Sequence, residues 1–267
     1  MKWTQEAEEA IGKVPFFVRK KVRARVEKEA AENGRAVVSI AEVNATRQRF
    51  LSGMESEIRG YRVETCFGSG GCPNRAYESE NLIRSLENLL EKENLLEFLT
   101  SRVKGPLKFH HEFSISISDC PNACSQPQIR DVGIIGAAVP GVTETECTQC
   151  QSCVETCREN SIRLDGENGG PVIDTALCVS CGQCVNACPS GTLKTVQKGF
   201  RVLLGGKLGR HPCLGRELPG IYTQDEVLEI VKTCIAFWRE HSQKGERFAA
   251  LFQASDFAAF AERFCKH

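Results

Sequence analysis

The sequence lacks net charge, long apolar runs and nucleotide-binding glycine motifs, and each absence excludes a class of function. The 267 residues include 34 lysines and arginines and 34 aspartates and glutamates, so net charge does not favour nucleic acid or an anionic membrane as a partner. No stretch approaches the roughly 18 apolar residues of a membrane span. The patterns G-x-G-x-x-G and G-x-x-x-x-G-K-S/T are absent, which leaves nicotinamide, flavin and nucleotide binding without support.

The chain also lacks the features of a secreted disulfide scaffold, although it is rich in cysteine. Its first residues, MKWTQEAEEAIGKV, are charged and amphipathic, unlike a secretory signal peptide. The 15 cysteines are an odd number in a long chain, whereas small secreted scaffolds are short and tend to an even count. We therefore expect a cytoplasmic protein most of whose thiols bind metal.

Residues 1–57 contain no cysteine and are predicted to form three helices. The first runs from Trp3 to Ile11, and the second follows Pro15 and stops at Asn33. Ser39 and Glu42 fit a capping box that opens the third. The sequence thus predicts a small helical module, for packing or docking, with no catalytic residue.

From about residue 58 the pattern changes to strands, glycines and cysteines. Strands are expected at 61–65, 108–118, 129–139 and 200–205, a helix at 79–100, and C-terminal helices opened by Thr223 with Glu226 and by Ser255. Strands on both sides of residues 141–194 predict that this cysteine-dense segment is inserted into a sheet domain. The fold class is therefore α+β.

The predicted strand at 108–118 alternates apolar and polar residues, which places its polar side chains on one face. Lys108 and His110 are then expected to point the same way, either into a functional site or over solvent.

Eight cysteines form an internal repeat in which C-x2-C-x2-C-x3-C occurs twice. The runs are Cys147, Cys150, Cys153, Cys157 and Cys178, Cys181, Cys184, Cys188. The repeat resembles a two-cluster ferredoxin domain, in which the fourth cysteine of each run serves the other cluster. That resemblance implies one 4Fe-4S cluster on Cys147, Cys150, Cys153 and Cys188, and another on Cys178, Cys181, Cys184 and Cys157. Arg158 departs from the proline usual in that family, and zinc binding is the alternative use of such spacings.

Four further cysteines form a C-x5-C pair, Cys66 and Cys72, and a C-x3-C pair, Cys120 and Cys124, each after a predicted strand. C-x5-C followed by C-P-N-x-C resembles the sirohaem and 4Fe-4S half-domain of the sulfite and nitrite reductases. The downstream segment FRVLLGGKLGRHP resembles the segment after the ferredoxin insertion in the dissimilatory sulfite reductases.

The resemblance implies how the chain is divided. It implies a half-domain of residues 58–140 and 195–267 with an inserted ferredoxin domain, 141–194. The N-terminal W-x-x-E-A-E, P-F-F-V-R-K-K-V-R and E-K-E-A motifs resemble the small helical C-terminal domain of a light-independent protochlorophyllide reductase subunit. Residues 1–57 are then a separate helical module.

The family resemblance also implies cofactors and their contacts. The four further cysteines would hold a third 4Fe-4S cluster, with Cys124 also bridging to sirohaem iron, and a cluster without haem is the alternative. Sirohaem carries eight carboxylates and needs cations around it. The expected contacts of the sirohaem are Arg75, Asn122, Cys124, Arg130, Lys207, Arg210 and His211. The expected substrate-binding and catalytic residues are Arg62, Lys108 and His110, and His110 replaces a lysine of the family.

Cys213, Cys234 and Cys265 fit no cluster spacing, and Cys234 is expected in the core.

These expectations define a function and its alternatives. The first is an oxidoreductase in which two ferredoxin clusters feed a third cluster coupled to sirohaem, reducing a small oxyanion such as sulfite or nitrite. The alternatives are a non-catalytic electron carrier and a tetrapyrrole-binding protein that serves a partner enzyme. Electrons must come from a protein donor, and the single half-domain predicts a homodimer or a hetero-complex. Nucleic acid and membrane partners are not expected.

Overall fold

The computed structural model describes residues 1–166 and 169–265, without the side chains of 51–56 and 69. The chain forms two compact units, one of residues 1–58 with 105–108, and one of residues 59–104 with those from 109 onward. Within the described ranges, no helix is both long and apolar enough to cross a bilayer. The two units are described in turn.

The first unit contains the three predicted helices, α1 (Gln5–Gly12), α2 (Phe16–Glu32) and α3 (Ile40–Ser56). The predicted capping box is present, because the Ser39 backbone N–H and hydroxyl both donate to Glu42 Oε2, at 2.9 and 2.6 Å. The first helix begins at Gln5 rather than Trp3, because Lys2–Trp3 forms β1 and pairs in parallel with β2 (Val37–Val38). Strands of two residues are too short to show a period of two in a sequence.

The second unit is built on a five-stranded sheet with the order β3-β4-β5-β8-β9. Its strands are β3 (Tyr61–Thr65), β4 (Phe113–Ser118), β5 (Val132–Val142), β8 (Leu193–Leu204) and β9 (Arg216–Glu217). The first three are parallel, and β8 is antiparallel to both β5 and β9. The strand at 61–65 matches its prediction, whereas β5 begins later than predicted and β8 earlier.

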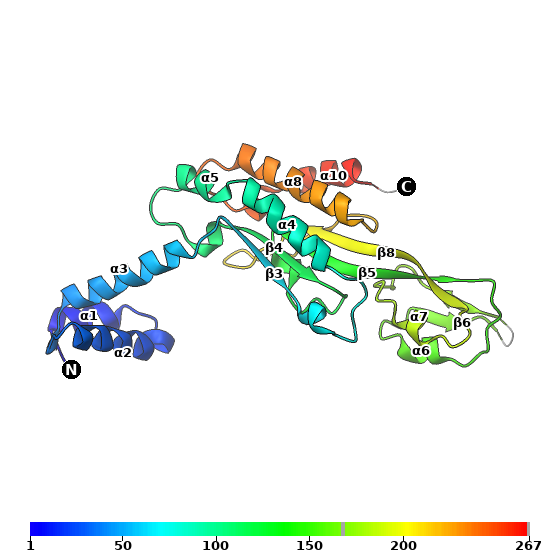
Figure 1. Ribbon diagram of the computed structural model, residues 1–267, viewed down its shortest axis with the longest axis horizontal. Helices are drawn as coiled ribbons and strands as arrows, with labels where there is room; N and C mark the ends of the chain where they lie inside the picture. The colour runs from blue at the N-terminus through cyan, green and yellow to red at the C-terminus, as the bar shows by residue number, and fades with distance from the viewer. Residues whose placement is uncertain (167–168, 266–267) are drawn as a thin grey trace. The chain divides into compact units, whose positions relative to one another are not determined.

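Helices α4 (Glu80–Lys92) and α8 (Gln224–His241) lie side by side over one face of the sheet (Figure 1). Leu82, Leu86 and Leu90, at helical spacing, bury the inner side of α4. The single helix predicted at 79–100 is wrong, because Asn94 adopts a left-handed conformation with φ of 47°. A second helix, α5 (Leu95–Arg102), begins after it.

Short helices α9 (Phe248–Leu251) and α10 (Ala254–Arg263) follow α8. The Thr223 and Glu226 capping box of α8 is present as predicted. The last helix instead begins one residue before the predicted cap, Ser255. Its box is formed by Gln253 with Asp256.

The strand predicted at 108–118 is wrong in its first half. Residues Phe109–His111 form a 3-10 turn, η2, and β4 begins only at Phe113. Lys108 lies before the turn and belongs to the first unit. The argument that placed Lys108 and His110 on one strand face therefore fails.

The polar face of β4 is not exposed to solvent, because every residue of the strand is buried. The Ser114 hydroxyl and backbone N–H both donate to Asp131 Oδ2, at 2.6 and 2.9 Å, and Ser116 donates to the Ser125 carbonyl at 2.7 Å. The solvent interpretation is thus contradicted for these serines. Each buried hydroxyl is satisfied internally, as burial of a polar group requires.

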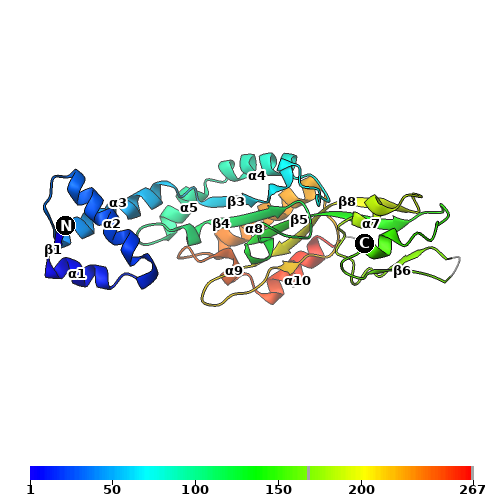
Figure 2. The ribbon, with the colours of Figure 1, turned by 90° about the horizontal axis from the view of Figure 1, so that it is seen from below.

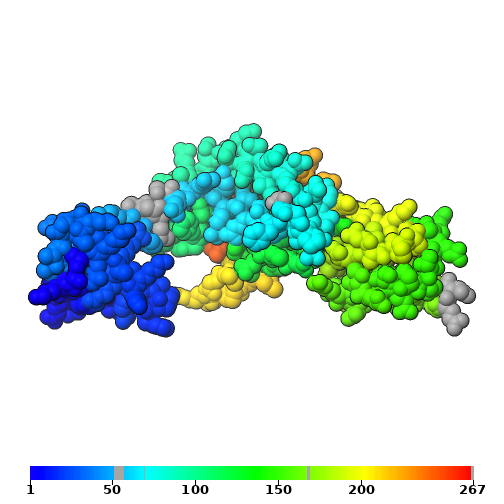
Figure 3. All heavy atoms as spheres, turned by 60° about the horizontal axis from the view of Figure 1, so that its bottom comes forward, coloured from blue at the N-terminus to red at the C-terminus, as the bar shows by residue number. Residues whose placement is uncertain are grey.

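The cysteine-dense segment leaves the sheet at the end of β5 and returns at the start of β8 (Figure 2). It contains two five-residue helices, α6 (Ser152–Thr156) and α7 (Gln183–Ala187), and a hairpin of β6 (Ile162–Leu164) and β7 (Pro171–Ile173). Its residues gather into one lobe in the space-filling view (Figure 3). Buried Cys153, Ile162, Cys184 and Leu193 form its small core.

The α8 capping box gives a test of the C-terminal packing. We expect Thr223→Ala to lower the free energy of unfolding by about 1 kcal/mol, because the Glu226 backbone N–H loses its acceptor. The control is Thr233→Ala on the same helix, where an exposed hydroxyl only back-bonds to the Glu229 carbonyl and alanine favours the helix. Chemical denaturation followed by fluorescence of buried Trp238 measures both. Equal losses in the two variants would contradict the role of the box.

Candidate metal centre

The two cysteine runs of the insertion repeat the same backbone geometry. Gln149 and Ser180 occupy equivalent positions and have left-handed φ values of 55° and 57°. Gln151 and Gly182, also equivalent, have φ of 61° and 71°. Left-handed residues other than glycine each cost about 1–2 kcal/mol. The first loop therefore carries this cost at Gln149 and Gln151, whereas the second carries it only at Ser180, because glycine at 182 adopts the conformation freely.

Cys153, from the first run, lies within electrostatic reach of Cys147 and of Cys188 from the second run. Burial raises the pKa of the Cys153 thiol most, and the thiols of Cys188 and Cys147 raise it further. Cys150 is exposed, and hydrogen bonds from Ser152 lower its pKa. The last cysteine of the second run thus lies with the first run.

The second run shows the reciprocal arrangement. Burial raises the pKa of Cys184 to about 12, with further contributions from the thiols of Cys181, Cys178 and Cys157. Cys157, the last cysteine of the first run, therefore lies with the second. Cys188 and Cys157 thus each lie near cysteines of the other run, which is the crossing that the ferredoxin resemblance implies.

The two crossing cysteines receive hydrogen bonds from the backbone. Cys157 Sγ accepts from the Ser161 N–H at 3.4 Å, and Cys188 Sγ accepts from the Leu193 N–H at 3.4 Å. Burial opposes ionisation of both thiols, but hydrogen bonds, including those from the hydroxyls of Ser161 and Ser190, outweigh it and lower both pKa values. The surroundings of these two sulfurs therefore stabilise the negatively charged thiolate form.

The third group comes from the ends of two neighbouring parallel strands. Cys66 follows β3 and Cys120 follows β4 by two residues, so both lie at the same edge of the sheet. Burial raises the pKa of Cys120, and the thiols of Cys66, Cys72 and Cys124 raise it further. The C-x5-C and C-x3-C pairs are therefore close together. Cys66 Sγ accepts backbone N–H bonds from Gly68 and Asp119, each at 3.3 Å.

The three groups each offer a donor set of four thiols, which is the set that a 4Fe-4S cluster uses. Over the ranges 1–166 and 169–265, no three or more histidine, cysteine, aspartate or glutamate side chains are arranged to hold a single metal ion. The cysteines as placed fit the donor chemistry of a cluster, and hydrogen bonds already reach sulfurs in all three groups.

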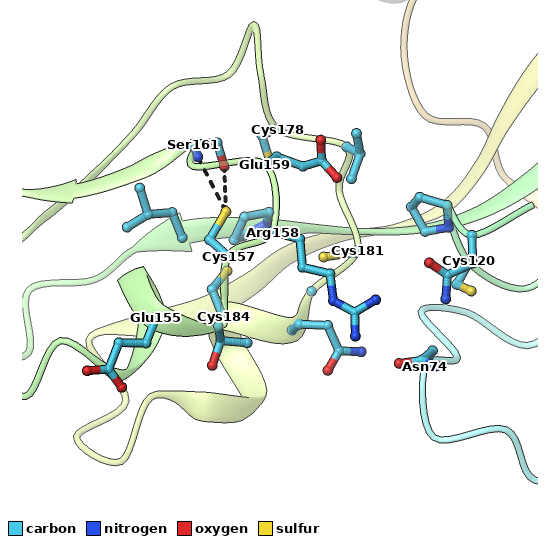
Figure 4. Close-up of a pocket in the computed structure, with 18 residues that line it drawn as sticks. Asn74, Cys120, Glu155, Cys157, Arg158, Glu159, Ser161, Cys178, Cys181 and Cys184 are labelled. Carbon is cyan, nitrogen blue, oxygen red and sulfur yellow. Dashed lines mark hydrogen bonds between the residues drawn. The ribbon is translucent and has the colours of Figure 1, made fainter.

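A cavity of about 440 Å³ lies beside the second and third cysteine groups. Its lining includes Cys157, Cys178, Cys181 and Cys184 from the insertion and Asn74, Cys120, Pro121 and Asn122 from the sheet domain. Arg158 extends into this cavity, toward the side where Asn74 and Cys120 lie (Figure 4). Among the described residues, no carboxylate pairs with it.

A second cavity, of about 340 Å³, collects several of the predicted cationic residues. It is lined by Arg62, Phe109, His110, Glu112, Ser114, Ile129, Arg130, Leu208, Gly209 and Arg247. Arg62 and Arg130 share one carboxylate, because both pair with Glu64. Burial raises the pKa of Glu112, which accepts the Arg59 backbone N–H at 2.9 Å. Three arginines, Arg62, Arg130 and Arg247, therefore line this cavity together with the carboxyl group of Glu112.

The other predicted contacts are distributed differently. Arg75 pairs with Asp119 and Glu80 and lines neither cavity. Lys207 lies in a loop whose backbone pairs with that of Cys213, and Arg210 and His211 are exposed in the same loop. Lys108 is exposed and belongs to the first unit.

The remaining cysteines lie outside these groups, and three relevant residues escaped prediction. Cys234 is fully buried in α8, as expected, whereas Cys213 and Cys265 are exposed. Sequence reasoning missed Asp119 and Arg247 and gave Arg158 no role. Asp119 immediately precedes Cys120, which is the signal that would have drawn attention to it. Arg247 has no motif around it.

Comparison with known proteins identifies the second unit. Residues 59–267 match the model of the nitrite and sulphite reductase 4Fe-4S domain. The chain belongs to this family. Residues 3–47 match the model of the proto-chlorophyllide reductase 57 kD subunit, as the N-terminal motifs indicated. The crystal structure of dissimilatory sulfite reductase I superposes with a TM-score of 0.52 and 19% identity, over 77% of this chain and 52% of that one, which supports the fold.

Two relatives show how this family member compares in length. A coenzyme F420-dependent sulfite reductase from Methanocaldococcus jannaschii is 29% identical over 199 residues, which are 74% of this chain and 29% of the relative. One subunit of the anaerobic sulfite reductase of Salmonella typhimurium is 27% identical over 221 residues, covering 75% of this chain and 60% of the relative. The chain thus spans less than two thirds of either relative.

The thiol environments predict an order of reactivity in the cluster-free, reduced protein. Alkylation requires the thiolate, so Cys150, whose pKa is lowered, is expected to react at lower pH than Cys184, whose pKa is raised to about 12. We expect Cys184 to stay unmodified at pH 8 and to react only as the pH rises toward 12. Peptide mass spectrometry after timed labelling measures both sites. The reverse order would contradict the described burial.

Proposed function

We propose that this chain carries electrons to a bound sirohaem and forms part of the site at which a small oxyanion, sulfite or nitrite, is reduced. The observation that carries the proposal is the cavity lined by Cys120 together with Cys157, Cys178, Cys181 and Cys184. It puts thiols of the insertion and of the sheet domain around one space, so electrons have a short path between them. Family membership supports the reaction class.

The proposed ligands follow the three thiol groups. Cys147, Cys150, Cys153 and Cys188 hold one 4Fe-4S cluster, Cys178, Cys181, Cys184 and Cys157 the second, and Cys66, Cys72, Cys120 and Cys124 the third. The mutual effects of the thiols on their pKa values support each set. The clusters supply one-electron transfer, and the sirohaem supplies the centre at which the oxyanion is reduced.

The residues of this chain then have separate tasks. Cys124 is the exposed member of its group, which suits a thiol that also reaches the sirohaem iron. Arg130, with Lys207, Arg210, His211 and Asn122, is proposed to contact the anionic macrocycle. Arg62 binds the oxyanion. His110 donates protons to the oxygen atoms of the oxyanion, which leave as water. Support comes from the cavity that Arg62, His110 and Arg130 share.

The chain is further proposed to work within a homodimer or hetero-complex and to receive electrons from a protein donor. One relative is by name a subunit, and the chain matches only part of each relative. A second half-domain supplied by another chain completes the substrate site in this proposal. The module of residues 1–57 is proposed to serve packing or docking.

The visible spectrum and iron content of the anaerobically purified protein test this proposal. We expect sirohaem bands together with about 12 cluster irons and as many acid-labile sulfides per chain. Cys124→Ser is expected to change the haem spectrum, because the bridging thiolate is lost, and exposed Cys265→Ser serves as the matched control. A broad cluster absorption without haem bands would support the electron carrier instead. Native haem spectra in Cys124→Ser would refute the bridge.

Arg158 tests the electron path through the first cavity. Reduction adds negative charge to a cluster, so a cation in the cavity favours the reduced form. We expect Arg158→Gln to make the midpoint potentials of the two adjacent clusters more negative, with a larger shift at low salt. Arg163→Gln is the control, since that arginine is exposed and pairs with Asp165 at 3.6 Å. Potentiometric titration followed by electron paramagnetic resonance measures the shift. Equal potentials in both variants would contradict this role for Arg158.

A further inference from the structure

Asp119 connects the two loops that carry the third group of cysteines. It lies between β4 and Cys120, and its side chain is 3% exposed. Its backbone N–H donates to Cys66 Sγ at 3.3 Å. Its carbonyl accepts from the backbone N–H groups of Ala76 and Tyr77, at 2.9 and 3.2 Å. The backbone of this one residue therefore holds both ends of the first cysteine loop, residues 66–77.

The Asp119 carboxylate fixes the same loop a second time. Oδ2 accepts from Arg75 Nε at 2.9 Å, three residues after Cys72, and Oδ1 accepts from the hydroxyl of Ser79, the residue that precedes α4. Arg75 continues the network by pairing with Glu80 in the first turn of α4. The loop is thus tied to the C-x3-C segment and to a helix that packs on the sheet.

Two glycines let Asp119 approach this closely. A Cβ at Gly68, between Cys66 and Cys72, would collide with the Asp119 carboxylate. A Cβ at Gly136, in β5, would come within 2.6 Å of the Asp119 carbonyl oxygen. Neither glycine has positive φ, so the close approach, and not the backbone conformation, is what requires glycine at these positions.

We infer that Asp119, with Arg75 as its partner, is a positioning residue that holds Cys66 and Cys72 at the correct distance from Cys120 and Cys124. The inference rests on the proposed third cluster. It assigns Arg75 a different role from the sirohaem contact predicted for it, since its guanidinium is bound to Asp119 and Glu80. Replacing a residue that orients metal ligands typically lowers metal affinity by about 10- to 100-fold.

The test compares two substitutions that remove the same charge. Asp119→Asn keeps the shape and one acceptor but loses the charge-assisted bond from Arg75. Asp165→Asn removes a carboxylate that is exposed and that, among the residues the structure describes, forms an ion pair with Arg163 alone. In chelator challenge of the anaerobic protein, we expect Asp119→Asn to lose about 4 of 12 cluster irons, at least tenfold faster than wild type. Asp165→Asn should keep all of them.

The ferredoxin clusters of the same molecules show whether the variant is folded. Their paramagnetic resonance signals should persist in Asp119→Asn while the signal of the third cluster is lost or altered. Gly68→Ala should reproduce the selective loss with Asp119 intact, and it decides the question if Asp119→Asn is recovered unfolded.

The possible outcomes separate this inference from the function on which it rests. Wild-type retention of the third cluster in both variants would overturn the positioning role alone. A wild-type protein with only about 8 cluster irons would overturn the proposed third cluster and this inference with it. Loss of iron from all three clusters in both Asp119→Asn and Gly68→Ala would show that Asp119 only stabilises the fold in general. That result would also overturn the positioning role.

Discussion

The pairing of β5 with its neighbours is the interaction on which every group of cysteines depends. On one side β5 pairs with β4, the strand that leads into Cys120. On the other it pairs with β8 along its whole length, so the insertion starts and ends on two adjacent strands. Gly136 lies against the Asp119 carbonyl, and Ala138 forms a bridge with Cys181. One strand therefore contacts the third cysteine group and the insertion within three residues.

The register of β5 is irregular at the point where the strand leaves the main sheet and leads into the insertion. The register of β5 against β8 shifts between Val139 and Pro140, and Pro140 lines the cavity next to the insertion. Proline lacks an N–H and is tolerated in a sheet at such a shift. From there the strand pair continues as the stem of the insertion. A rigid stem limits how far the second cysteine group can move from Cys120, which is a condition for efficient electron transfer.

Local patterns made much of this architecture predictable. The cysteine spacings are short-range and repeat, and the two runs form loops with the same left-handed positions. The strand at 61–65 and the capping boxes at Ser39 and Thr223 are equally local, and the structure confirms them. The family itself was identified from these motifs and confirmed by comparison.

Three predictions failed, one because of distant partners and two because a local pattern was extended too far. The serines of β4 alternate like an exposed strand face, but they are buried because Asp131 and Ser125, from the following loop, satisfy them. The break at Asn94 was missed because helix propensity on both sides is high. His110 lies in a turn rather than a strand, since the apolar alternation that begins at Phe113 was extended too far toward the N-terminus.

The insertion carries local costs that the proposed binding of clusters would offset. Left-handed Gln149, Gln151 and Ser180 each store about 1–2 kcal/mol of backbone strain. Burial opposes ionisation of Cys153 and Cys184, which must lose their protons to bind iron. Cys153 and Cys184 lie in the short helices α6 and α7, within the small apolar core of the insertion. In the proposed function, folding of the insertion would therefore be linked to the binding of its clusters.

The chain has no net charge, but the arginines near the cysteine motifs differ in the carboxylates with which they pair. Arg75 is neutralised by Asp119 and Glu80, so it stabilises the protein's own loop rather than an external anion. Arg62 and Arg130 instead share the carboxylate of Glu64, and Glu112 lines the same cavity within electrostatic reach of Arg62. Because all three arginines lie near motif residues in the sequence, only the pairing distinguishes them. Arg62 and Arg130 line a cavity that an anionic ligand could enter, whereas Arg75 lines neither cavity and is held by Asp119 and Glu80.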